Sequence, residues 1–316
     1  MTQYEAYNTP QQDDEIDLRE LFATIWAGKW LIIAITFVFA VSGVAYALYK
    51  PNIYQANVLL APANKEGGVG GISGQLGGLA SLAGINLGSG GSNQAVIARE
   101  VLQSRAFLAN FIRRHNLEIS LMAAEAWNSK SQEWRYNREV YNPETGEWLT
   151  DDEGESYKPT DWDLVNAFKE RHLSVSENKD SGMIKLSVKS LSPPAAKEWA
   201  EWLVMDINEH MRQQDVVKAN ARINYLEEKL NDTSVAGMQQ VFYQLIESET
   251  RTVMLANAQQ EYVFETVDPA VVPQEKSEPK RAMVAFVATM LGCMLGVFTV
   301  FIRASISRGK KENANE

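Results

Sequence analysis

The sequence predicts an α+β protein that is anchored by two transmembrane helices and has a mixed α/β base domain with a long projecting helical arm. Two uncharged apolar runs, 30–49 and 282–302, lie near opposite ends of the chain, and the polar part between them contains no comparable run. Short alternating segments early and late in that polar part indicate strands, and a long stretch without Gly or Pro indicates an extended helix.

Each apolar run has about the length of a helix that crosses a ~30 Å hydrocarbon core at ~1.5 Å per residue. The first run follows an acidic leader of 29 residues rather than a short basic one, so we expect a retained anchor and not a cleaved signal peptide. Arg19 and Lys29 precede the first run, and Arg303, Arg308, Lys310 and Lys311 follow the second. Because Lys and Arg are retained on the cytoplasmic side, this pattern favours cytoplasmic termini, although Lys276, Lys280 and Arg281 weaken the bias.

These expectations define five segments of the chain. They are a cytoplasmic tail with a short amphipathic helix (1–29), the first transmembrane helix (30–49), a periplasmic α/β domain (50–281), the second transmembrane helix (282–302) and a short cytoplasmic tail (303–316). The amphipathic helix is indicated by Leu18, Leu21, Phe22, Ile25 and Trp26. An N-terminal extension of the first transmembrane helix is the alternative interpretation of this pattern.

Composition excludes some functions for the central part. The chain has 30 Lys and Arg against 40 Asp and Glu, a formal net charge of -10, which does not favour nucleic acid as a partner. Its only cysteine, Cys293, lies in the second apolar run, so the central domain has no disulfide. The region 67–91 holds 11 of the 20 glycines but no following Lys, and we expect a flexible loop rather than a phosphate cradle.

The central domain is expected to contain the following elements in order. They are a strand at 53–61, a helix at about 94–115, two short strands at 134–140 and 148–150 around a turn at 142–146, a helix at 161–171, strands at 173–176 and 183–189, long helices at about 194–231 and 238–260, and a strand at 262–267. The first long helix carries an apolar seam with steps of three and four residues, which indicates a partner helix. The seam consists of Val216, Ala219, Ile223, Leu226 and Leu230.

Small residues lie four positions apart in both apolar runs, at Gly43 and Ala47 and at Gly292 and Gly296. Such spacing lets two helix backbones approach closely in lipid, so these residues are candidates for specific helix packing, with chance spacing as the alternative. Pro269, Pro273 and Pro279 precede the second run, and we expect an extended, fairly stiff segment there, or a plain linker.

No catalytic constellation is recognised in the sequence. His115, His172 and His210 are far apart and none has a second ligand at zinc spacing. No serine elbow or kinase signature occurs. The sequence therefore predicts a scaffold with no catalytic residue, no metal site and no cofactor, rather than an enzyme.

Several ordered segments resemble the Wzz-type chain-length determinants, or polysaccharide co-polymerases, of Gram-negative inner membranes. They are Asp13–Leu18 before Gly28-Lys29-Trp30, Pro51–Ala56, Glu100–Leu108 and Asp268–Pro273. The resemblance implies a ring-like homo-oligomer that works beside a polysaccharide polymerase on a lipid-linked polysaccharide in the inner membrane. Lys276 stands where the family often has a further proline, and the 13 residues after Arg303 contain no Walker-type sequence or tyrosine, unlike members with a kinase extension.

The sequence thus predicts a non-enzymatic regulator of the modal chain length of a surface polysaccharide, with lipopolysaccharide O antigen as the favoured polymer. A kinase-less co-polymerase for exopolysaccharide or capsule export is the alternative within the family. A membrane-anchored periplasmic ligand sensor is the alternative from another class, and it would require a preformed pocket with convergent polar groups.

Overall fold

The computed structural model describes residues 18–63 and 90–312, which form two compact units. Unit 1 combines the part up to Lys50 with the part from Pro279 onward, and unit 2 runs from Pro51 to Glu278. The tail before Leu18 and most of the predicted glycine-rich loop lie outside the described residues.

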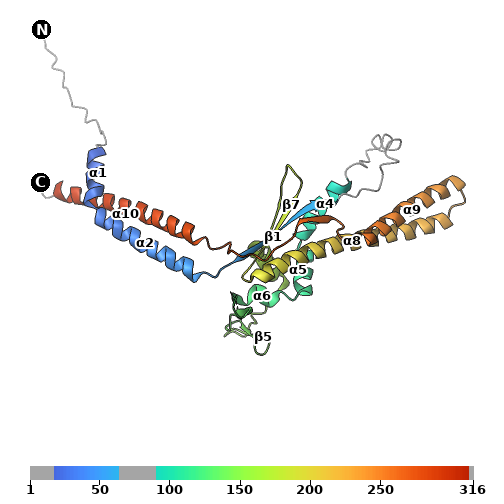
Figure 1. Ribbon diagram of the computed structural model, residues 1–316, viewed down its shortest axis with the longest axis horizontal. Helices are drawn as coiled ribbons and strands as arrows, with labels where there is room; N and C mark the ends of the chain where they lie inside the picture. Colours follow the sequence, from blue (N-terminus) through green and yellow to red (C-terminus); the bar gives the residue numbers. More distant parts are fainter. Residues whose placement is uncertain (1–17, 64–89, 313–316) are drawn as a thin grey trace, which may run out of the picture. The chain divides into compact units, whose positions relative to one another are not determined.

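Over residues 18–50 and 279–312, unit 1 consists of three helices. A short helix α1 (Leu18–Ala27) is followed, after Gly28, by α2 (Lys29–Tyr49), and α10 (Arg281–Glu312) lies alongside α2 (Figure 1). The predicted apolar runs thus lie within α2 and α10. One helix ends at Ala27 and the next begins at Lys29, so Leu18–Tyr49 is not a single continuous helix. This agrees with the interpretation of a separate amphipathic helix rather than an extension of the first apolar helix.

Unit 2 is built on an antiparallel sheet of four strands in the order β6-β7-β1-β8. The strands are β1 (Tyr54–Pro62), β6 (Leu173–Glu177), β7 (Ile184–Ser190) and β8 (Phe264–Asp268). Side chains alternate across a strand, and the register pairs the buried ones with one another, as in Ala56 with Val188 and Val58 with Leu186. One face of the sheet therefore belongs to the hydrophobic core.

Helices supply the rest of that core. They are α4 (Gly90–Leu102), α5 (Arg105–Arg114), α7 (Asp161–Ala167), a π-helical turn η1 (Phe168–His172) and the first half of α8 (Pro193–Asn231). Leu108, Phe111, Phe168, Trp199 and Leu203 are its large buried members. The core thus joins segments that lie more than 200 positions apart in the chain, such as Val58 of β1 and Phe264 of β8, with the sheet on one side and helices on the other.

The prediction of one continuous helix over 94–115 was wrong. The chain breaks between α4 and α5, because the hydroxyl of Ser104 accepts a hydrogen bond from the backbone N–H of Phe107 at 3.3 Å and caps a new helix. The apolar side was also misplaced in α4, where Val96 and Ile97 are exposed while Ala98 and Leu102 are buried.

Two small hairpins follow the short helix α6 (Glu118–Met122). They pair β2 (Ala124–Asn128) with β3 (Glu133–Tyr136), and β4 (Tyr141–Asn142) with β5 (Glu147–Trp148). The turn predicted at 142–146 is present, with Gly146 at a positive φ of 74°. Residues 134–136, however, pair with β2 rather than with the strand after that turn, so this part of the strand prediction was wrong.

The 39-residue helix α8 belongs to two environments. Its first half, up to Met211, lies in the core, whereas its second half packs against α9 (Ala236–Ala258) as a helical hairpin (Figure 1). Arg222 and Glu249 form an ion pair across this hairpin at 3.2 Å. At ~1.5 Å per residue α8 extends ~58 Å, so one rigid element links the base of unit 2 to its arm.

The side chain of Asn208 joins α8 to β8. Its Oδ1 accepts hydrogen bonds from the backbone N–H groups of Val263 and Phe264 at 2.8 and 2.9 Å, and its Nδ2 donates to the carbonyl of Phe264 at 2.9 Å. All three residues are buried. These backbone groups are buried, so no water could form their hydrogen bonds if the Asn208 amide were absent.

We expect Asn208→Ala to destabilise unit 2. Two buried N–H groups would lose their acceptor at ~1–3 kcal/mol each, and we take about 3 kcal/mol as the total. For a domain of this size that lowers the melting temperature by about 6–12 °C, which differential scanning fluorimetry of the full chain in detergent would measure.

The matched control is Asn220→Ala, because Asn220 is exposed on the same helix. It should shift the melting temperature by no more than ~2 °C. Equal melting temperatures for the wild type and both variants would contradict the role of Asn208.

His172 provides a pH-dependent prediction. Burial lowers the pKa of His172 below its ordinary value of 6.5, although its Nδ1 hydrogen bond to the carbonyl of Lys189 (2.8 Å) opposes the shift and nearby Arg171 adds to it. The folded state then binds fewer protons than the unfolded chain, so the contribution of His172 is complete above pH 6.5 and is lost as the pH falls toward the lower folded pKa.

We therefore expect the melting temperature of the wild type to fall more steeply below pH 6.5 than that of His172→Gln, which does not titrate. Parallel profiles for the two proteins would show that the imidazole is not held in its neutral form. Melting curves in matched buffers from pH 7.5 to 5 would decide this.

Candidate functional site

Helices α2 and α10 are long and apolar enough to cross a membrane, over Lys29–Tyr49 and Arg281–Ala304. Only 6% and 17% of their apolar windows are buried. A helix in the core of a soluble protein would be mostly buried, whereas these helices expose large apolar side chains such as Phe37, Phe286 and Phe298. By length, composition and exposure, they are two candidate membrane helices that flank a central domain.

The two helices approach each other at glycines of α10. A Cβ at Gly292 would lie 2.7 Å from the Cβ of Phe39 and 3.0 Å from the Cα of Thr36. A Cβ at Gly296 would lie 3.0 Å from the Cα of Ile32. Backbone atoms of α2 thus occupy the space that a side chain would need, so only glycine permits this separation of the helices.

The small residues of α2 continue the same contact. A Cβ at Gly43 would overlap the Cβ of Ala288, and Ala47 is 2% exposed. Gly43, Gly292 and Gly296 therefore lie at one helix–helix interface, and Ala47, one turn beyond Gly43 on α2, is buried. Pairing runs antiparallel, since residues further along α2 meet residues earlier in α10.

Sequence analysis missed Gly28 as a packing residue. A Cβ at Gly28 would lie 2.5 Å from both methyl groups of Val300, so the turn between α1 and α2 is also held against α10. The signal was present as a stripe at steps of four in α10, which consists of Val284, Ala288, Gly292, Gly296 and Val300.

The helix α1 has an exposed aromatic face. Phe22 and Trp26 stack with ring centroids 6.2 Å apart, and they are 66% and 62% exposed. The ammonium of Lys29 lies 4.7 Å from the ring centroid of Trp26. Aromatic rings beside a basic residue at the end of an apolar helix are typical of a membrane–water interface.

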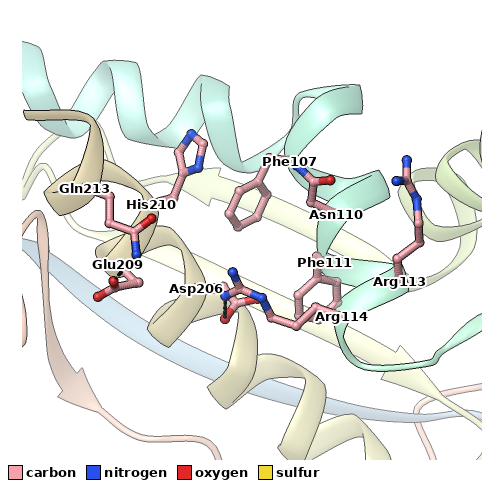
Figure 2. Close-up of a pocket in the computed structure, with 9 residues that line it drawn as sticks. All are labelled: Phe107, Asn110, Phe111, Arg113, Arg114, Asp206, Glu209, His210 and Gln213. Carbon is pink, nitrogen blue, oxygen red and sulfur yellow. Dashed lines mark hydrogen bonds and ion pairs between the residues drawn. The ribbon is translucent and has the colours of Figure 1, made fainter. Parts of the chain in front are cut away.

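Unit 2 contains a cavity of about 400 Å³ between α5 and α8 (Figure 2). Residues from α5 supply one wall, and residues from a single face of α8 supply the other. The lining residues are Phe107, Asn110, Phe111, Arg113, Arg114, Asp206, Glu209, His210 and Gln213. We refer to this cavity as the α5–α8 pocket.

Asp206 holds the base of the α5–α8 pocket together. Its Oδ1 accepts a hydrogen bond from Arg114 Nη1 and its Oδ2 contacts His115 Nε2, both at 3.0 Å. The Asp206 side chain is 7% exposed, and the His115 ring stacks on Trp202 at 4.4 Å. A buried carboxylate with two partners on α5 fixes the position of that helix against α8.

Further along α8, Glu209 and His210 have shifted pKa values. Hydrogen bonding from Arg212, reinforced by Gln213, lowers the pKa of Glu209 despite partial burial. Burial lowers the pKa of His210, and the charges of Arg114 and Lys218 lower it further. At neutral pH the pocket therefore contains an ionised carboxylate and a neutral imidazole.

The residues of the seam predicted on α8 are buried or half-buried, and Val216 packs against the core of unit 2. Ala219 is 1% exposed, and Val216, Ile223, Leu226 and Leu230 are partly buried. The three prolines lie in the segment between β8 and α10, in which the only regular pairing is an isolated bridge between Ile53 and Glu278. This bridge ties the two ends of unit 2 together.

Across residues 18–63 and 90–312, no group of three or more His, Cys, Asp or Glu side chains is arranged to hold a metal ion. The carboxylates of the α5–α8 pocket are engaged by arginines and by His115 rather than by one another.

These features define a class of protein with two candidate membrane helices around a large α+β domain that carries a long helical hairpin. Comparison with known families places the chain more closely. Residues 14–115 match the family model of chain length determinant proteins, Wzz, and residues 231–305 match the G-rich domain found on putative tyrosine kinases, GNVR. The chain is thus similar to the Wzz chain length determinants over about a third of its length and to GNVR domains over about a quarter.

Among curated proteins, the chain is similar to the tyrosine-protein kinase etk of Escherichia coli K12 and of Escherichia coli O127:H6. Each is 33% identical over 114 residues, which is 35% of this chain. The match spans only 14% of the length of those kinases.

Two solved structures are also similar. One is a full-length bacterial polysaccharide co-polymerase, with a TM-score of 0.39 and 13% identity over 92% of this chain and 99% of that one. The other is a fragment of WzzB, a polysaccharide co-polymerase from Salmonella Typhimurium, with a TM-score of 0.29 and 13% identity over 72% of this chain and 100% of that one.

The glycine contacts can be tested directly. We expect Gly292→Leu to push α2 away from α10 by on the order of 2 Å, because interaxial distance depends on the side chains at the contact. Spin labels at Ile33→Cys and Leu295→Cys, in a Cys293→Ser background, would measure the change by electron spin resonance in nanodiscs.

Thr289→Leu provides the matched control, since Thr289 is exposed on the same helix. Its label distance should equal that of the unsubstituted protein. If Gly292→Leu leaves the distance unchanged as well, the close approach is not required.

Proposed function

We propose that this protein sets the modal chain length of a lipid-linked surface polysaccharide, specifically lipopolysaccharide O antigen, and does so as a non-enzymatic oligomeric scaffold beside a polymerase. The observation that carries the proposal is the match of residues 14–115 to chain length determinant proteins, a range that includes α1, α2 and β1. A regulator of this kind needs positioned binding surfaces and no reaction centre.

The proposed topology places both termini in the cytoplasm of a Gram-negative bacterium and unit 2 in the periplasm. Basic residues beyond the apolar stretch of α10, and those before α2, support this orientation under the positive-inside rule. The polymer that the protein would regulate must then be extended on the periplasmic side, where unit 2 lies.

The proposed oligomer explains apolar surface that one copy leaves uncovered. On α9, Met238, Val241 and Leu245 are 46–48% exposed at steps of three and four residues, and Leu255, further along the helix, is 40% exposed. This stripe lies on a different face from the one that packs against α8. Arms from neighbouring copies would cover it, as in helices that pack around one another.

Roles for the residues named from the sequence follow from this assembly. Gly43, Ala47, Gly292 and Gly296 would fix the separation of the two spans, and the α8 seam would stiffen the arm. The segment with Pro269, Pro273 and Pro279 would transmit the position of β8 to the second span, because proline restricts the backbone. These roles are part of the proposal.

A co-polymerase for export of capsule or exopolysaccharide is the second candidate. It is favoured by the match of residues 231–305 to a domain of putative tyrosine kinases and by the similarity to the etk kinases. The two candidates share an oligomeric membrane scaffold, and they differ in which polymer depends on it.

Deletion of the gene distinguishes these candidates. If the protein sets O-antigen length, the deletion strain should keep making O antigen while its length distribution broadens and loses its mode, as seen on silver-stained gels of lipopolysaccharide. As a control, the wild-type gene supplied on a plasmid to the deletion strain should restore the modal length of the O antigen.

Loss of secreted capsule or exopolysaccharide with unchanged O antigen would support the export candidate instead. Unchanged length and amount of every surface polysaccharide would refute both. Mass photometry of the purified protein in nanodiscs would test the scaffold separately, and a single-copy particle that restores the mode would contradict the proposed oligomer.

A further inference from the structure

We propose that the α5–α8 pocket is a glycan-binding subsite that takes a neutral sugar ring. The proposal rests on the proposed function only for the source of the glycan, because the pocket's own chemistry indicates the class of ligand. No residue named from the sequence as a candidate lies in this pocket.

The size and floor of the pocket suit a sugar ring. Its volume of about 400 Å³ is near the lower end of the ~300–1,000 Å³ range of small-molecule sites. The rings of Phe107 and Phe111, which are 5% and 2% exposed, lie at the bottom of the pocket between the polar side chains of α5 and α8 and offer a small apolar contact area (Figure 2). A pyranose has an apolar C–H face that packs on aromatic carbon and a rim of hydroxyl groups that requires polar partners.

Planar polar groups surround that floor. Arg113 donates to Asp161 at 2.6 Å and Arg114 to Asp206 at 3.0 Å, and because a guanidinium has five N–H donors, these pairs leave donors of both side chains for other partners. The amides of Asn110 and Gln213, both exposed, add a donor and an acceptor each. Paired donors and acceptors in a plane match the neighbouring hydroxyls of a sugar.

Charge balance argues against a strongly charged ligand. Arg113 and Arg114 are offset by Asp206 and Glu209 within the lining, and His210 is neutral at neutral pH. An anion would face two carboxylates, and a metal ion would face carboxylates whose oxygens are already engaged. Neutral hydroxyl groups are not repelled by the carboxylates and do not require free carboxylate oxygens.

The pocket is held in shape before a ligand arrives. Asp206 fixes Arg114 and His115, the His115 ring stacks on Trp202, and Glu209 orients Gln213 through a hydrogen bond. Pre-oriented side chains lose little conformational entropy on binding, which matters for a ligand that makes few contacts.

Binding can be measured on the full chain in nanodiscs by saturation-transfer-difference NMR and titration. The probe is a set of oligosaccharides of one to four repeat units, released by mild acid from the surface polysaccharide of the cells that express the protein. The double variant Asn110→Ala/Gln213→Ala should bind at least about tenfold more weakly, because two hydrogen-bonding amides are lost.

Asn220→Ala is the matched control on the exposed face of α8, and it should bind like the wild type. Melting curves would show that the double variant is folded, which its exposed positions favour. Inorganic phosphate at millimolar concentration should not compete, and affinity should change less than twofold between 50 and 500 mM salt.

Equal affinity of the double variant and the wild type would overturn the pocket assignment, and so would the absence of any oligosaccharide binding. Competition by phosphate, or a steep salt dependence, would overturn the neutral-sugar class in favour of an anion. If the gene deletion changes polymer length but the double variant binds normally, the proposed function stands and this pocket does not serve it.

Discussion

The close approach of two helix backbones in unit 1 is the contact on which the arrangement of the chain depends. Gly292 and Gly296 meet the backbone of α2, so the helices can pair only where side chains are missing. In lipid there is little hydrophobic gain from pairing apolar helices, and dispersion between closely packed atoms has to provide the stabilisation. Because the pairing is antiparallel, the end of α2 and the beginning of α10 meet at one end of the pair. The bridge between Ile53 and Glu278 brings the corresponding ends of unit 2 together.

Within unit 2, the connection between the core and the arm depends on α8 being one continuous helix. Its first half is as deeply buried as the sheet, with Leu203 and Ile207 at 0% exposure, whereas beyond Met211 only Ala219 is counted among its buried residues. A helix this long is stabilised by tertiary packing at one end and by a partner helix at the other, because intrinsic propensity alone gives little stability. The backbone hydrogen bonds of α8 therefore run without a break from the core into the arm.

Local patterns in the sequence were sufficient for the features that repeat along the chain. The apolar runs, the α8 seam and the small residues at four-residue spacing are all periodic, and the structure places Gly43, Gly292 and Gly296 at one interface, with Ala47 buried one turn beyond Gly43. The break at Ser104 was missed because apolar periodicity continues through it, while a single capping side chain ends the helix. Such periodic patterns could not predict the α5–α8 pocket. Arg114 and Asp206 are 92 positions apart, and only the packed core shows that they meet.

The pocket and the attachment of β8 use opposite sides of the same turns of α8. Asp206, Glu209 and Gln213 line the pocket, whereas Asn208 binds the backbone of Val263 and Phe264, and Asp215 accepts a hydrogen bond from Tyr262 at 2.7 Å. A helix transmits rotation and displacement as a rigid body, since its backbone hydrogen bonds resist local distortion. The spacing of the pocket residues on α8 is therefore maintained by the contacts that hold β8, and β8 leads through the proline segment to α10. A ligand that required a different position of α8 would have to work against the buried hydrogen bonds of Asn208, so the pocket is suited to a ligand that fits its existing shape.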